Sequence, residues 1–262
     1  DHMQFLGNTV REIAGEKAGI IVPGVPVIYD GNDKDAAEVI AAKAKELGSP
    51  AYKVIQAGAK VLGNNKDGID FSLEDDYYGD TRFHIPFIAW YQVMNASLAL
   101  TTMEVLKDRI PVTMEQLQAG IANTRWQGRM ETILPGVIVD GAHNEDGVRR
   151  FVETAERFQK EYPLTLLFSA VNDKDYQDMI HTICSRIKFR KVVTTEVGGY
   201  REVPSAELAE IFCKEGCKDV GNSDNIEEAF HMAHEAKGED GMLFCVGSLY
   251  LVGEIKTLLL KK

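Results

Sequence analysis

The sequence predicts an α/β fold in two parts, and three observations support this prediction. After residue 123, short apolar runs alternate with helical stretches, which is typical of a parallel sheet covered by helices on both faces. Before residue 123, helices and strands are mixed, and there are too few expected strands for the number of expected helices. The length of 262 residues allows one or two domains. We therefore expect an incomplete mixed part over residues 1–123 and a complete doubly wound α/β domain over residues 124–262.

Capping and turn residues bound the elements of the first part. The apolar periodicity of residues 35–47 predicts an amphipathic helix that ends at Gly48. Thr113, followed by Glu115 and Gln116, has the pattern of a helix N-cap. The other expected elements are helices over residues 9–18 and within residues 85–109, and strands over residues 25–29, 52–55 and 68–73.

The second part repeats a strand followed by a helix. Each expected strand is a short apolar run, which is typical of a strand buried on both faces. The expected strands are residues 133–134, 136–139, 164–168, 191–195 and 242–246. The expected helices are residues 147–159, 176–187, 205–214, 226–236 and 249–260. This alternation predicts a sheet between two layers of helices.

The charge balance limits the partners of the protein. The 29 basic and 40 acidic residues give a net charge of −11, whereas nucleic-acid phosphates are bound by basic surfaces. We therefore expect no nucleic-acid partner, although a local basic pocket for one small anion is compatible with this charge. No apolar run reaches the ~18 residues of a membrane span, and no signal-peptide pattern opens the chain. We expect a cytoplasmic protein without a membrane partner.

The four cysteines lack the spacing of a structural metal site. Cys213 and Cys217 lie four positions apart in a helical stretch, so we expect them to share a helix face. A zinc site needs further ligands at short spacing, and none follows them. Together with Cys184 and Cys245, they are expected to be free thiols in a reducing compartment.

The strongest candidate site follows the apolar run of residues 137–139. Asp140, His143 and Asn144 come directly after this run and before the next expected helix. Open α/β sheets bind ligands outside the carboxyl ends of their strands. There, these side chains could orient a nucleophile, accept a proton or hold a metal-bound phosphate. The alternative is a structural turn, in which Asp140 is a capping acid, His143 lies on the surface and Gly141 has a positive φ.

Two further motifs of the second part contain groups that bind anions. In RWQGRME, residues 125–131, Arg129 follows a glycine, and its planar guanidinium suits a phosphate or carboxylate. The alternative for Arg129 is a salt bridge in a domain linker. In GSLYLVGE, residues 247–254, Ser248 lies at an expected strand-to-helix turn, where N–H groups and a hydroxyl can face an anion. The alternative for Ser248 is a plain helix N-cap.

Two motifs of the first part are weaker signals. Near the N-terminus, His2 lies beside an acid and could bind Mg²⁺ next to a nucleotide. Lys17 follows Glu16 on the first expected helix, where the alternative is a solvated Glu–Lys face. Gln92 and Asn95 lie three positions apart on an expected helix and could contact a nucleotide base. The alternative for both amides is a surface position with ordinary hydrogen bonds.

Together these motifs resemble the folylpolyglutamate synthase family, which includes bifunctional dihydrofolate synthases and lies within the Mur ligase superfamily. The resemblance covers nearly the whole chain, in the order of the family and roughly at its spacing. The most specific blocks are DHMQFLGNTVREIAGEKAGIIVPGVPV and DGAHN, where the Mur peptidoglycan ligases have different residues. The other matching segments are QVMNASLAL, RWQGRME, the DKD of residues 173–175 and CVGSLYLVGE.

The resemblance implies a fold and a reaction. Residues 1–123 would be the C-terminal part of an ATP-binding domain, and residues 124–262 a Rossmann-like C-terminal domain that binds glutamate. In the implied ligase reaction, ATP phosphorylates the γ-carboxylate of a folate, and the amine of L-glutamate attacks the acyl phosphate. Dihydropteroate is a second implied acceptor. Mg²⁺ is the implied cofactor, a monovalent cation is a further candidate, and a monomer is expected.

In the first part, the resemblance implies roles for three residues. His2 resembles the Mg²⁺ ligand of the family, Lys17 its carbamylated lysine beside a second metal ion, and Asn95 its adenine-contacting asparagine. The family also has a P-loop that cradles the ATP phosphates, but no G-x-x-x-x-G-K-[ST] occurs in residues 1–262. We therefore expect a C-terminal fragment that has an unmodified Lys17, binds ATP weakly if at all and does not ligate glutamate by itself.

In the second part, the resemblance implies roles for four residues. Arg129 and Asp140 resemble the residues that close over ATP, and His143 and Ser248 those that position glutamate. Lys17 from the first part, Asp140 and His143 are the implied catalytic residues. A cationic arginine would stabilise the charge that develops on the transferred phosphoryl group. A His/Asp pair could orient the unprotonated amine at the acyl phosphate.

Two other interpretations of the sequence remain open. The first is another Mur-type amino-acid ligase that acts on a different carboxylate. The second is a binding or regulatory module without catalytic activity, because the P-loop is absent from residues 1–262. Only the family resemblance of the motifs distinguishes a folate ligase from these two alternatives.

Overall fold

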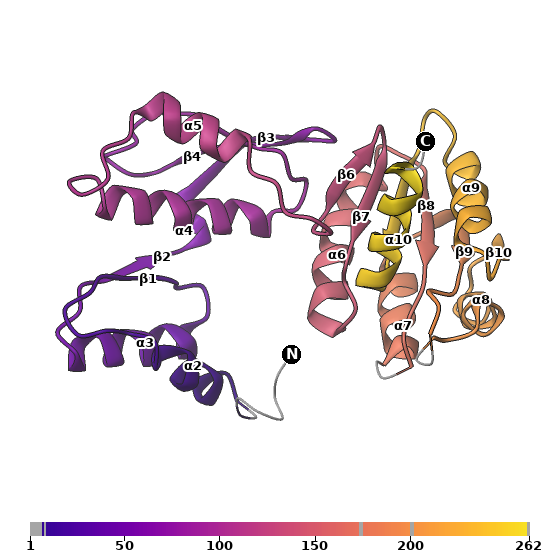
Figure 1. The fold of residues 1–262 in the computed structure, drawn as a ribbon, viewed down its shortest axis with the longest axis horizontal. Helices are drawn as coiled ribbons and strands as arrows, with labels where there is room; N and C mark the ends of the chain where they lie inside the picture. Colours follow the sequence, from indigo (N-terminus) through magenta and orange to yellow (C-terminus); the bar gives the residue numbers. More distant parts are fainter. Residues whose placement is uncertain (1–6, 8, 173–174, 200–201, 261–262) are drawn as a thin grey trace. The chain divides into compact units, whose positions relative to one another are not determined.

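The computed structural model describes residue 7 and residues 9–172, 175–199 and 202–260. The chain divides between Thr124 and Arg125 into two compact units, named unit 1 and unit 2 in chain order. Both units combine helices and strands, which confirms the prediction of an α/β protein (Figure 1). Among the described residues, no helix has both the length and the apolar character that crossing a membrane requires. His2 and two residues of the DKD segment, Asp173 and Lys174, lie outside the described residues.

Unit 1 contains two small sheets. Strands β1 (Val27–Asp30) and β2 (Ala51–Val54) pair in parallel. Strands β3 (Ala59–Asn65), β4 (Gly68–Leu73) and β5 (Phe83–Ile85) form an antiparallel sheet in that order. The helices of the unit are α2 (Val10–Ala18), α3 (Lys34–Glu46), α4 (Tyr91–Val105) and α5 (Met114–Ala122), and a 3₁₀ turn, η1 (Gln56–Gly58), joins β2 to β3.

Side-chain caps set the starts of three helices in unit 1. Thr9 Oγ1 accepts the Glu12 N–H at 3.2 Å and the Glu12 carboxylate accepts the Thr9 N–H at 3.1 Å, a reciprocal capping box for α2. Thr113 and Gln116 make the same arrangement at α5, at 3.2 and 2.9 Å, so the predicted Thr113 cap is confirmed. Asp33 caps α3 by accepting one backbone N–H at 2.9 Å.

The core of unit 1 lies between α4 and the antiparallel sheet. Phe71 of β4 and Phe83 of β5 are fully buried, and their ring centroids lie 5.8 Å apart. Leu100 of α4 belongs to the same cluster. The buried Tyr78 hydroxyl donates to the Leu100 carbonyl at 2.7 Å. Helix α4, which carries Asn95, is therefore fixed by its buried face.

Unit 2 is built on a sheet with strand order β10-β9-β8-β11-β7-β6 in the described residues. Neighbouring strands are parallel except β6, which is antiparallel to β7. The strands are β6 (Glu131–Leu134), β7 (Val137–Asp140), β8 (Leu164–Phe168), β9 (Phe189–Thr194), β10 (Val220–Asn222) and β11 (Met242–Val246). The helices are α6 (Glu145–Phe158), α7 (Tyr176–Arg186), α8 (Ser205–Lys214), α9 (Ile226–Lys237) and α10 (Leu249–Leu260).

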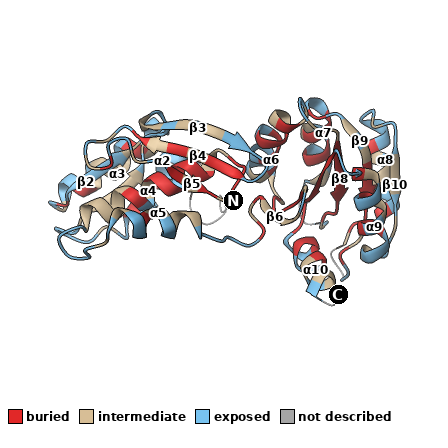
Figure 2. Cartoon of the chain, turned by 90° about the horizontal axis from the view of Figure 1, so that it is seen from above, coloured by how far each residue is buried: buried red, intermediate tan, exposed pale blue. Residues whose placement is uncertain are grey.

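Helices cover both faces of this sheet, as the sequence predicts. On one face, the ring of Phe151 from α6 lies 5.5 Å from that of Phe244, and Phe212 from α8 lies 5.3 Å from Phe168. On the other face, α9 and α10 belong to a cluster that includes Cys245 of β11. Successive strand residues point to opposite faces. Strand β8 is buried along its whole length (Figure 2), and so is β11.

The chain changes its direction across the sheet at β11. From β7 it runs through α6, β8, α7, β9 and α8 to β10, and it returns through α9 to β11, between β7 and β8. Helix α6 follows β7 on one face, and α10 follows β11 on the other. Two neighbouring parallel strands thus lead into helices on opposite faces. Such a topological switch point is where α/β sheets bind ligands.

The differences from the predicted elements are at sheet edges and at one turn. Strands β3, β5 and β10, which were not expected, are all edge strands and pair on one side only. Cys217 lies beyond the end of α8, so the prediction that Cys213 and Cys217 share a helix face is wrong. Gly216 has a φ of +92° and turns the chain between them. The ends of the other expected strands and helices differ by at most two residues from the observed ends.

Candidate functional site

Two turns of unit 2 lie side by side at the carboxyl edge of the sheet. The β7 turn comprises residues 140–144, and the β11 turn comprises residues 247–248. Strands β7 and β11 pair in parallel with Asp140 opposite Val246, so both turns begin at the same level. The sequence places each turn after a strand, but the pairing of these two strands is what brings Asp140, His143 and Ser248 to one edge.

Asp140 is the buried anchor of the β7 turn and is 4% exposed. Its Oδ1 accepts the Ala142 N–H at 2.8 Å, and its Oδ2 accepts the Met130 N–H at 2.8 Å. Asp140 does not cap the following helix, because Asn144 caps α6 by accepting the Gly147 N–H at 2.8 Å. The alternative of Asp140 as a capping acid is therefore wrong, and its carboxylate instead joins the β7 turn to the segment that precedes β6.

Burial changes the ionisation of Asp140. Because the carboxyl group is removed from water, its pKa rises from the ordinary 3.8 to about 6. The two backbone N–H groups and the positive charges of Arg129 and His143 act in the opposite direction and favour the carboxylate. Asp140 is thus a carboxyl group that changes its charge just below neutral pH, close to an arginine and a histidine.

Close packing explains Gly141 of the β7 turn. A Cβ at this position would lie 2.2 Å from Cδ2 of Leu249, the first residue of α10. Its φ is not positive, so the alternative that gave Gly141 a positive φ is wrong. The Gly141 N–H donates to the Gly128 carbonyl at 2.8 Å. Gly141 therefore lets the β7 turn contact both α10 and the segment before β6.

The imidazole ring of His143 is half-buried and is oriented by the backbone. Its Nδ1 lies 2.7 Å from the Gly141 carbonyl oxygen. A carbonyl oxygen only accepts hydrogen bonds, so this geometry puts a proton on Nδ1. In the neutral ring, Nε2 is then the nitrogen that can accept a hydrogen bond or a proton from a ligand.

Ser248 caps α10 and also has a hydrogen to donate. The residue is 2% exposed, and its Oγ accepts the Tyr250 N–H at 3.1 Å, as in a helix N-cap. A hydroxyl that accepts in this way still has its own O–H donor. Gly247 has a φ of +110°, and a Cβ there would lie 2.0 Å from the carbonyl oxygen of Ser169, which follows β8. The β11 turn is therefore packed tightly against the end of β8.

Arg129 is presented from a strained segment beside Asp140. It lies between Gly128 and Met130, whose φ values are +65° and +47°. A positive φ is unusual for a methionine, and the Met130 N–H bond to Asp140 is one contact that holds it in place. Arg129 is half-buried, and its charge is near enough to favour the ionised form of Asp140.

An ion pair that sequence analysis missed supports the same segment. The Glu131 carboxylate accepts the Gly128 N–H at 2.8 Å and the Lys256 Nζ at 2.7 Å. Glu131 belongs to the RWQGRME motif, but Lys256 lies on α10, 125 positions further along the chain. No local pattern signals a pair at that separation. The ion pair ties the segment that carries Arg129 to the helix that Ser248 caps.

A buried hydroxyl lies at the end of the neighbouring strand. Ser169 follows β8, is fully buried, and its Oγ has no hydrogen-bond partner among the described residues. Sequence analysis missed it, although its position directly after a buried strand is the signal that identified Asp140.

The starts of α6 and α7 enclose a cavity of about 260 Å³. Its lining residues are Asn144, Glu145, Val148, Asp175, Asp178, Met179 and Thr182.

The candidate residues of unit 1 lie on helix surfaces. Lys17 is exposed in the last turn of α2. Asn95 is exposed on α4, and its Nδ2 donates to Oε1 of Gln92 at 2.8 Å. Gln92 itself is 5% exposed. The spacing of three positions therefore brings the two amides together, with Asn95 as the member that solvent or a ligand can reach.

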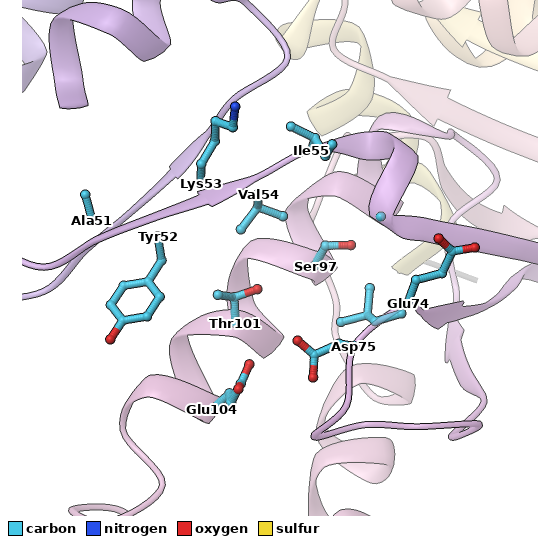
Figure 3. Close-up of a pocket in the computed structure, with 12 residues that line it drawn as sticks. Ala51, Tyr52, Lys53, Val54, Ile55, Glu74, Asp75, Ser97, Thr101 and Glu104 are labelled. Carbon is cyan, nitrogen blue, oxygen red and sulfur yellow. The ribbon is translucent and has the colours of Figure 1, made fainter.

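Unit 1 also contains a cavity of about 430 Å³ that sequence analysis missed (Figure 3). The carboxylates of Asp75 and Glu104 and the hydroxyl of Thr101 lie along it. Burial and the charge of Asp75 raise the pKa of Glu104, whereas Asp75 accepts the Tyr77 N–H at 2.7 Å. By helical spacing, Thr101 and Glu104 lie on a different face of α4 from Asn95. This cavity is therefore separate from the predicted base-contacting amide.

Comparison with known proteins shows which family the chain is similar to. Residues 128–249 match the family model described as "Mur ligase, glutamate ligase domain". The chain is 32% identical over 269 residues to the dihydrofolate synthase/folylpolyglutamate synthase of Bacillus subtilis, and the match covers 98% of this chain and 60% of that protein. Over nearly its whole length the chain is therefore similar to the folylpolyglutamate synthase/dihydrofolate synthase family, and residues 128–249 are similar to the glutamate ligase domain of the Mur ligases, as the sequence motifs indicate.

Solved structures of folylpolyglutamate synthases have the same fold. The crystal structure from Thermotoga maritima matches with a TM-score of 0.79 and 26% identity, over 96% of this chain and 58% of that one. An FPGS–AMPPCP complex matches with a TM-score of 0.74 and 27% identity, over 99% of this chain and 59% of that one. These matches confirm the predicted Mur-type α/β fold. The chain spans about 60% of the length of the curated relatives that it matches.

The magnesium site suggested by the family resemblance is not formed by the described residues alone. His2 lies outside them, and Lys17 is an exposed lysine on α2. In the described ranges, no three His, Cys, Asp or Glu side chains are arranged to hold a metal ion. The residues that the structure describes therefore do not fit Mg²⁺ by themselves, and the Mg²⁺ and monovalent-cation sites stay predictions.

Proposed function

We propose that this chain is part of an ATP-dependent ligase that joins L-glutamate to the γ-carboxylate of a tetrahydrofolate. A γ-carboxylate oxygen attacks the γ-phosphorus of ATP, and ADP leaves. The amine of glutamate then attacks the acyl carbon, phosphate leaves and the amide forms. The pair of preformed turns after β7 and β11 carries the proposal, in a chain that aligns over 98% of its length with a dihydrofolate synthase/folylpolyglutamate synthase. Glutamylation of dihydropteroate is a second activity that we propose for the same site.

The glutamate side of the proposed site consists of His143 and Ser248. The Nδ1–H of His143 is bound to the Gly141 carbonyl, so its Nε2 can accept a hydrogen bond from the attacking amine. The Ser248 Oγ accepts the Tyr250 N–H, so its O–H can donate to a substrate carboxylate. The positive end of α10 begins at the same turn and favours an anion there. Both groups are held by the backbone before substrate binds, which reduces the entropic cost of orienting glutamate.

The nucleotide side of unit 2 consists of Arg129 and Asp140. The guanidinium of Arg129 can pair with phosphate oxygens and stabilise the charge that develops during transfer. Each carboxylate oxygen of Asp140 already accepts one backbone N–H. Asp140 therefore supports Arg129 by holding the neighbouring Met130, and the carboxylate retains lone pairs for a further donor.

In unit 1 we propose that Asn95 contacts the adenine base and that Lys17 acts near the phosphates. An amide offers both a donor and an acceptor to a base edge, and Asn95 is exposed beside Gln92. The match to an FPGS–AMPPCP complex supports the use of ATP, because AMPPCP is an ATP analogue. In protein expressed from the full reading frame, the role of Lys17 as a carbamate, with His2 as a metal ligand, is proposed from the family resemblance, whereas Lys17 in a protein made only of residues 1–262 is expected to be unmodified.

A protein made only of residues 1–262 has no P-loop sequence. We propose that such a protein does not transfer glutamate and binds ATP weakly or not at all, because the P-loop supplies the N–H groups that cradle the phosphates. Isothermal titration with ATP and Mg²⁺ checks this directly. Robust ATP-dependent turnover by a homogeneous 29.1 kDa sample would contradict it.

The test of the proposed function is incorporation of labelled glutamate by protein expressed from the full reading frame that contains residues 1–262. ATP and Mg²⁺ are supplied with tetrahydrofolate, dihydropteroate or a UDP-muramyl peptide precursor in parallel reactions. Transfer to tetrahydrofolate is the expected result, and additional transfer to dihydropteroate would show a bifunctional enzyme.

The other outcomes of this assay separate the competing interpretations. Transfer only to the muramyl precursor would make the protein a Mur-type ligase for a different carboxylate. No transfer to any acceptor, with the protein folded, would favour the non-catalytic module. A catalytic-site control is His143→Ala in the same protein, which should abolish most of any transfer that is seen.

A further inference from the structure

Two thiols that the proposed reaction does not use lie close together in unit 2. Cys184 is in the last turn of α7, and Cys217 is in the turn that follows α8. Their Sγ atoms are 3.6 Å apart, although 33 positions separate them in the sequence. Cys184 is 5% exposed, whereas Cys217 is half-buried and accessible from solvent. The pair is therefore a product of the fold, and only one member is open to a small reagent.

The surroundings of the pair make the two thiols unequal. The S–H of Cys184 can donate to the Cys217 sulfur, which lowers the pKa of Cys217 and raises that of Cys184. The ammonium group of Lys188 also lowers the pKa of Cys217, while burial and Glu215 act in the opposite direction. A thiolate is the reactive form of cysteine. Cys217 is thus the nucleophile of the pair, and Cys184 is positioned to react second.

We propose that Cys184 and Cys217 form an oxidation site that reacts with hydrogen peroxide and closes to a reversible disulfide. The Cys217 thiolate attacks one peroxide oxygen, the O–O bond breaks, and water leaves after proton transfer, giving a sulfenic acid. The Cys184 sulfur then attacks the Cys217 sulfur, the S–O bond breaks and a second water leaves. Two thiols and one hydrogen peroxide thus give one disulfide and two waters, with two electrons passing from sulfur to oxygen.

The geometry allows this closure with a small movement. A disulfide needs its sulfurs at about 2.0 Å, so the two sulfur atoms, 3.6 Å apart, must approach by about 1.6 Å. Cys184 is fixed in a helix, but Cys217 lies in a turn next to Gly216, whose φ is +92°. The crosslink would join the end of α7 to the turn after α8. In a reducing compartment it would form only under oxidative conditions, and thiols would reverse it.

The other two cysteines provide matched controls. Cys213 is exposed on α8, and Cys245 is fully buried on β11 with a raised pKa. Neither is paired with a second thiol in the described residues. Because Cys213 is exposed and has no partner thiol, we expect it to oxidise slowly and to stop at the sulfenic acid or continue to higher oxides. Because Cys245 is buried and has no partner thiol, we expect it to remain reduced.

The experiment treats the protein with equimolar hydrogen peroxide and then counts free thiols and maps peptides without reduction. We expect the thiol count to fall from four to two, with a single Cys184–Cys217 crosslink that dithiothreitol reverses. We also expect the Tm to rise by about 10 °C, because the disulfide closes a loop of more than thirty residues. Cys213→Ser should form the same crosslink, and neither Cys217→Ser nor Cys184→Ser should form it.

Trapping the intermediate identifies the order of the steps. In Cys184→Ser, dimedone should label Cys217 as a sulfenic acid, whereas Cys217→Ser should leave Cys184 unlabelled. Circular dichroism establishes that each variant is folded, and Cys184→Ala replaces the serine variant if the buried hydroxyl disturbs α7. Four free thiols after peroxide treatment, or crosslinks that mainly contain Cys213, would overturn the proposal. This outcome does not depend on glutamate transfer.

Discussion

The candidate residues of unit 1 and unit 2 are held in different ways. In unit 2, Asp140, His143 and Ser248 lie where parallel strands end, and each makes a hydrogen bond to a backbone group two positions away. In unit 1, Lys17 and Asn95 are exposed on helix surfaces. The proposed glutamate-side residues, His143 and Ser248, are thus preorganised by backbone within one unit. Of the proposed nucleotide-side residues of unit 1, Asn95 is held by the side chain of Gln92 instead.

The largest effect is expected where the two turns of unit 2 press against the sheet. Gly247→Ala would place a Cβ 2.0 Å from the Ser169 carbonyl oxygen at a φ of +110°. We expect the free energy of unfolding to fall by about 4 kcal/mol, from overpacking and backbone strain together. Urea denaturation checks this. The control is Gly216→Ala, which has a φ of +92° but open space around its Cβ and should lose only about 1–2 kcal/mol. If Gly247→Ala and Gly216→Ala lose the same unfolding free energy, the β11 turn is not tightly packed.

A second test uses the pH dependence of stability. The pKa of Asp140 is raised from 3.8 to about 6 in the folded state, so the folded protein keeps this proton to higher pH than the unfolded chain. The resulting stabilisation is present below about pH 4 and is lost as pH rises through 6. Relative to Asp140→Asn, the wild type should lose up to about 3 kcal/mol between pH 4 and pH 7. Urea denaturation at several pH values measures this difference. If the wild type and Asp140→Asn give parallel plots of unfolding free energy against pH, the raised pKa of the buried Asp140 carboxyl is contradicted.

A carboxylate of unit 2 with the opposite behaviour serves as the control for this test. Burial raises the pKa of Asp146, but hydrogen bonds from Arg150 and Arg149 outweigh burial and lower it overall. Asp146→Asn should therefore remove a contribution that grows as pH rises. The two variants are expected to change the pH dependence in opposite directions, with a smaller effect at Asp146 because its side chain is exposed.

The next expected effect concerns the chemistry of the β7 turn. In protein expressed from the full reading frame, His143→Ala should lower the rate of glutamate incorporation by about 100-fold, because Nε2 no longer orients the amine. The unfolding free energy should change by less than about 1 kcal/mol, since the ring is half-buried and makes one backbone hydrogen bond. His181→Ala, at an exposed histidine of α7, should keep the wild-type rate. A His143 variant with full activity would remove this residue from the site.

Much of the fold of unit 2 could be predicted from the sequence because its central strands are buried on both faces. The continuous apolar runs predicted β8 and β11 with their observed ends, and the amphipathic stretches did the same for α8 and α10. The edge strand β10 was missed because its three residues, two half-buried and one exposed, give no clear pattern. The turn at Cys217 was missed because helical spacing was extended past Gly216, which the backbone uses to leave the helix.

The contents of the candidate site could be predicted, but their arrangement could not. Asp140, His143 and Ser248 were found because polar residues directly follow buried strands. The role of Gly141 depends on the approach of Leu249, and the Glu131–Lys256 ion pair joins residues 125 positions apart. Both depend on the pairing of β7 with β11, which is a long-range contact that no local pattern encodes. Ser169 had the same signal as Asp140 and was missed because a lone serine after a strand is common.

Steady-state kinetics on one variant from each unit shows which substrate each unit binds. In protein from the full reading frame, Ser248→Ala should raise the KM for glutamate by about 10-fold, from the loss of one hydrogen bond to the substrate carboxylate, and leave the KM for ATP unchanged. Asn95→Ala should raise the KM for ATP by a similar factor and leave that for glutamate unchanged. If Ser248→Ala instead changes the KM for ATP, or if neither variant shows a selective effect, the proposal that unit 2 binds glutamate through Ser248 is contradicted.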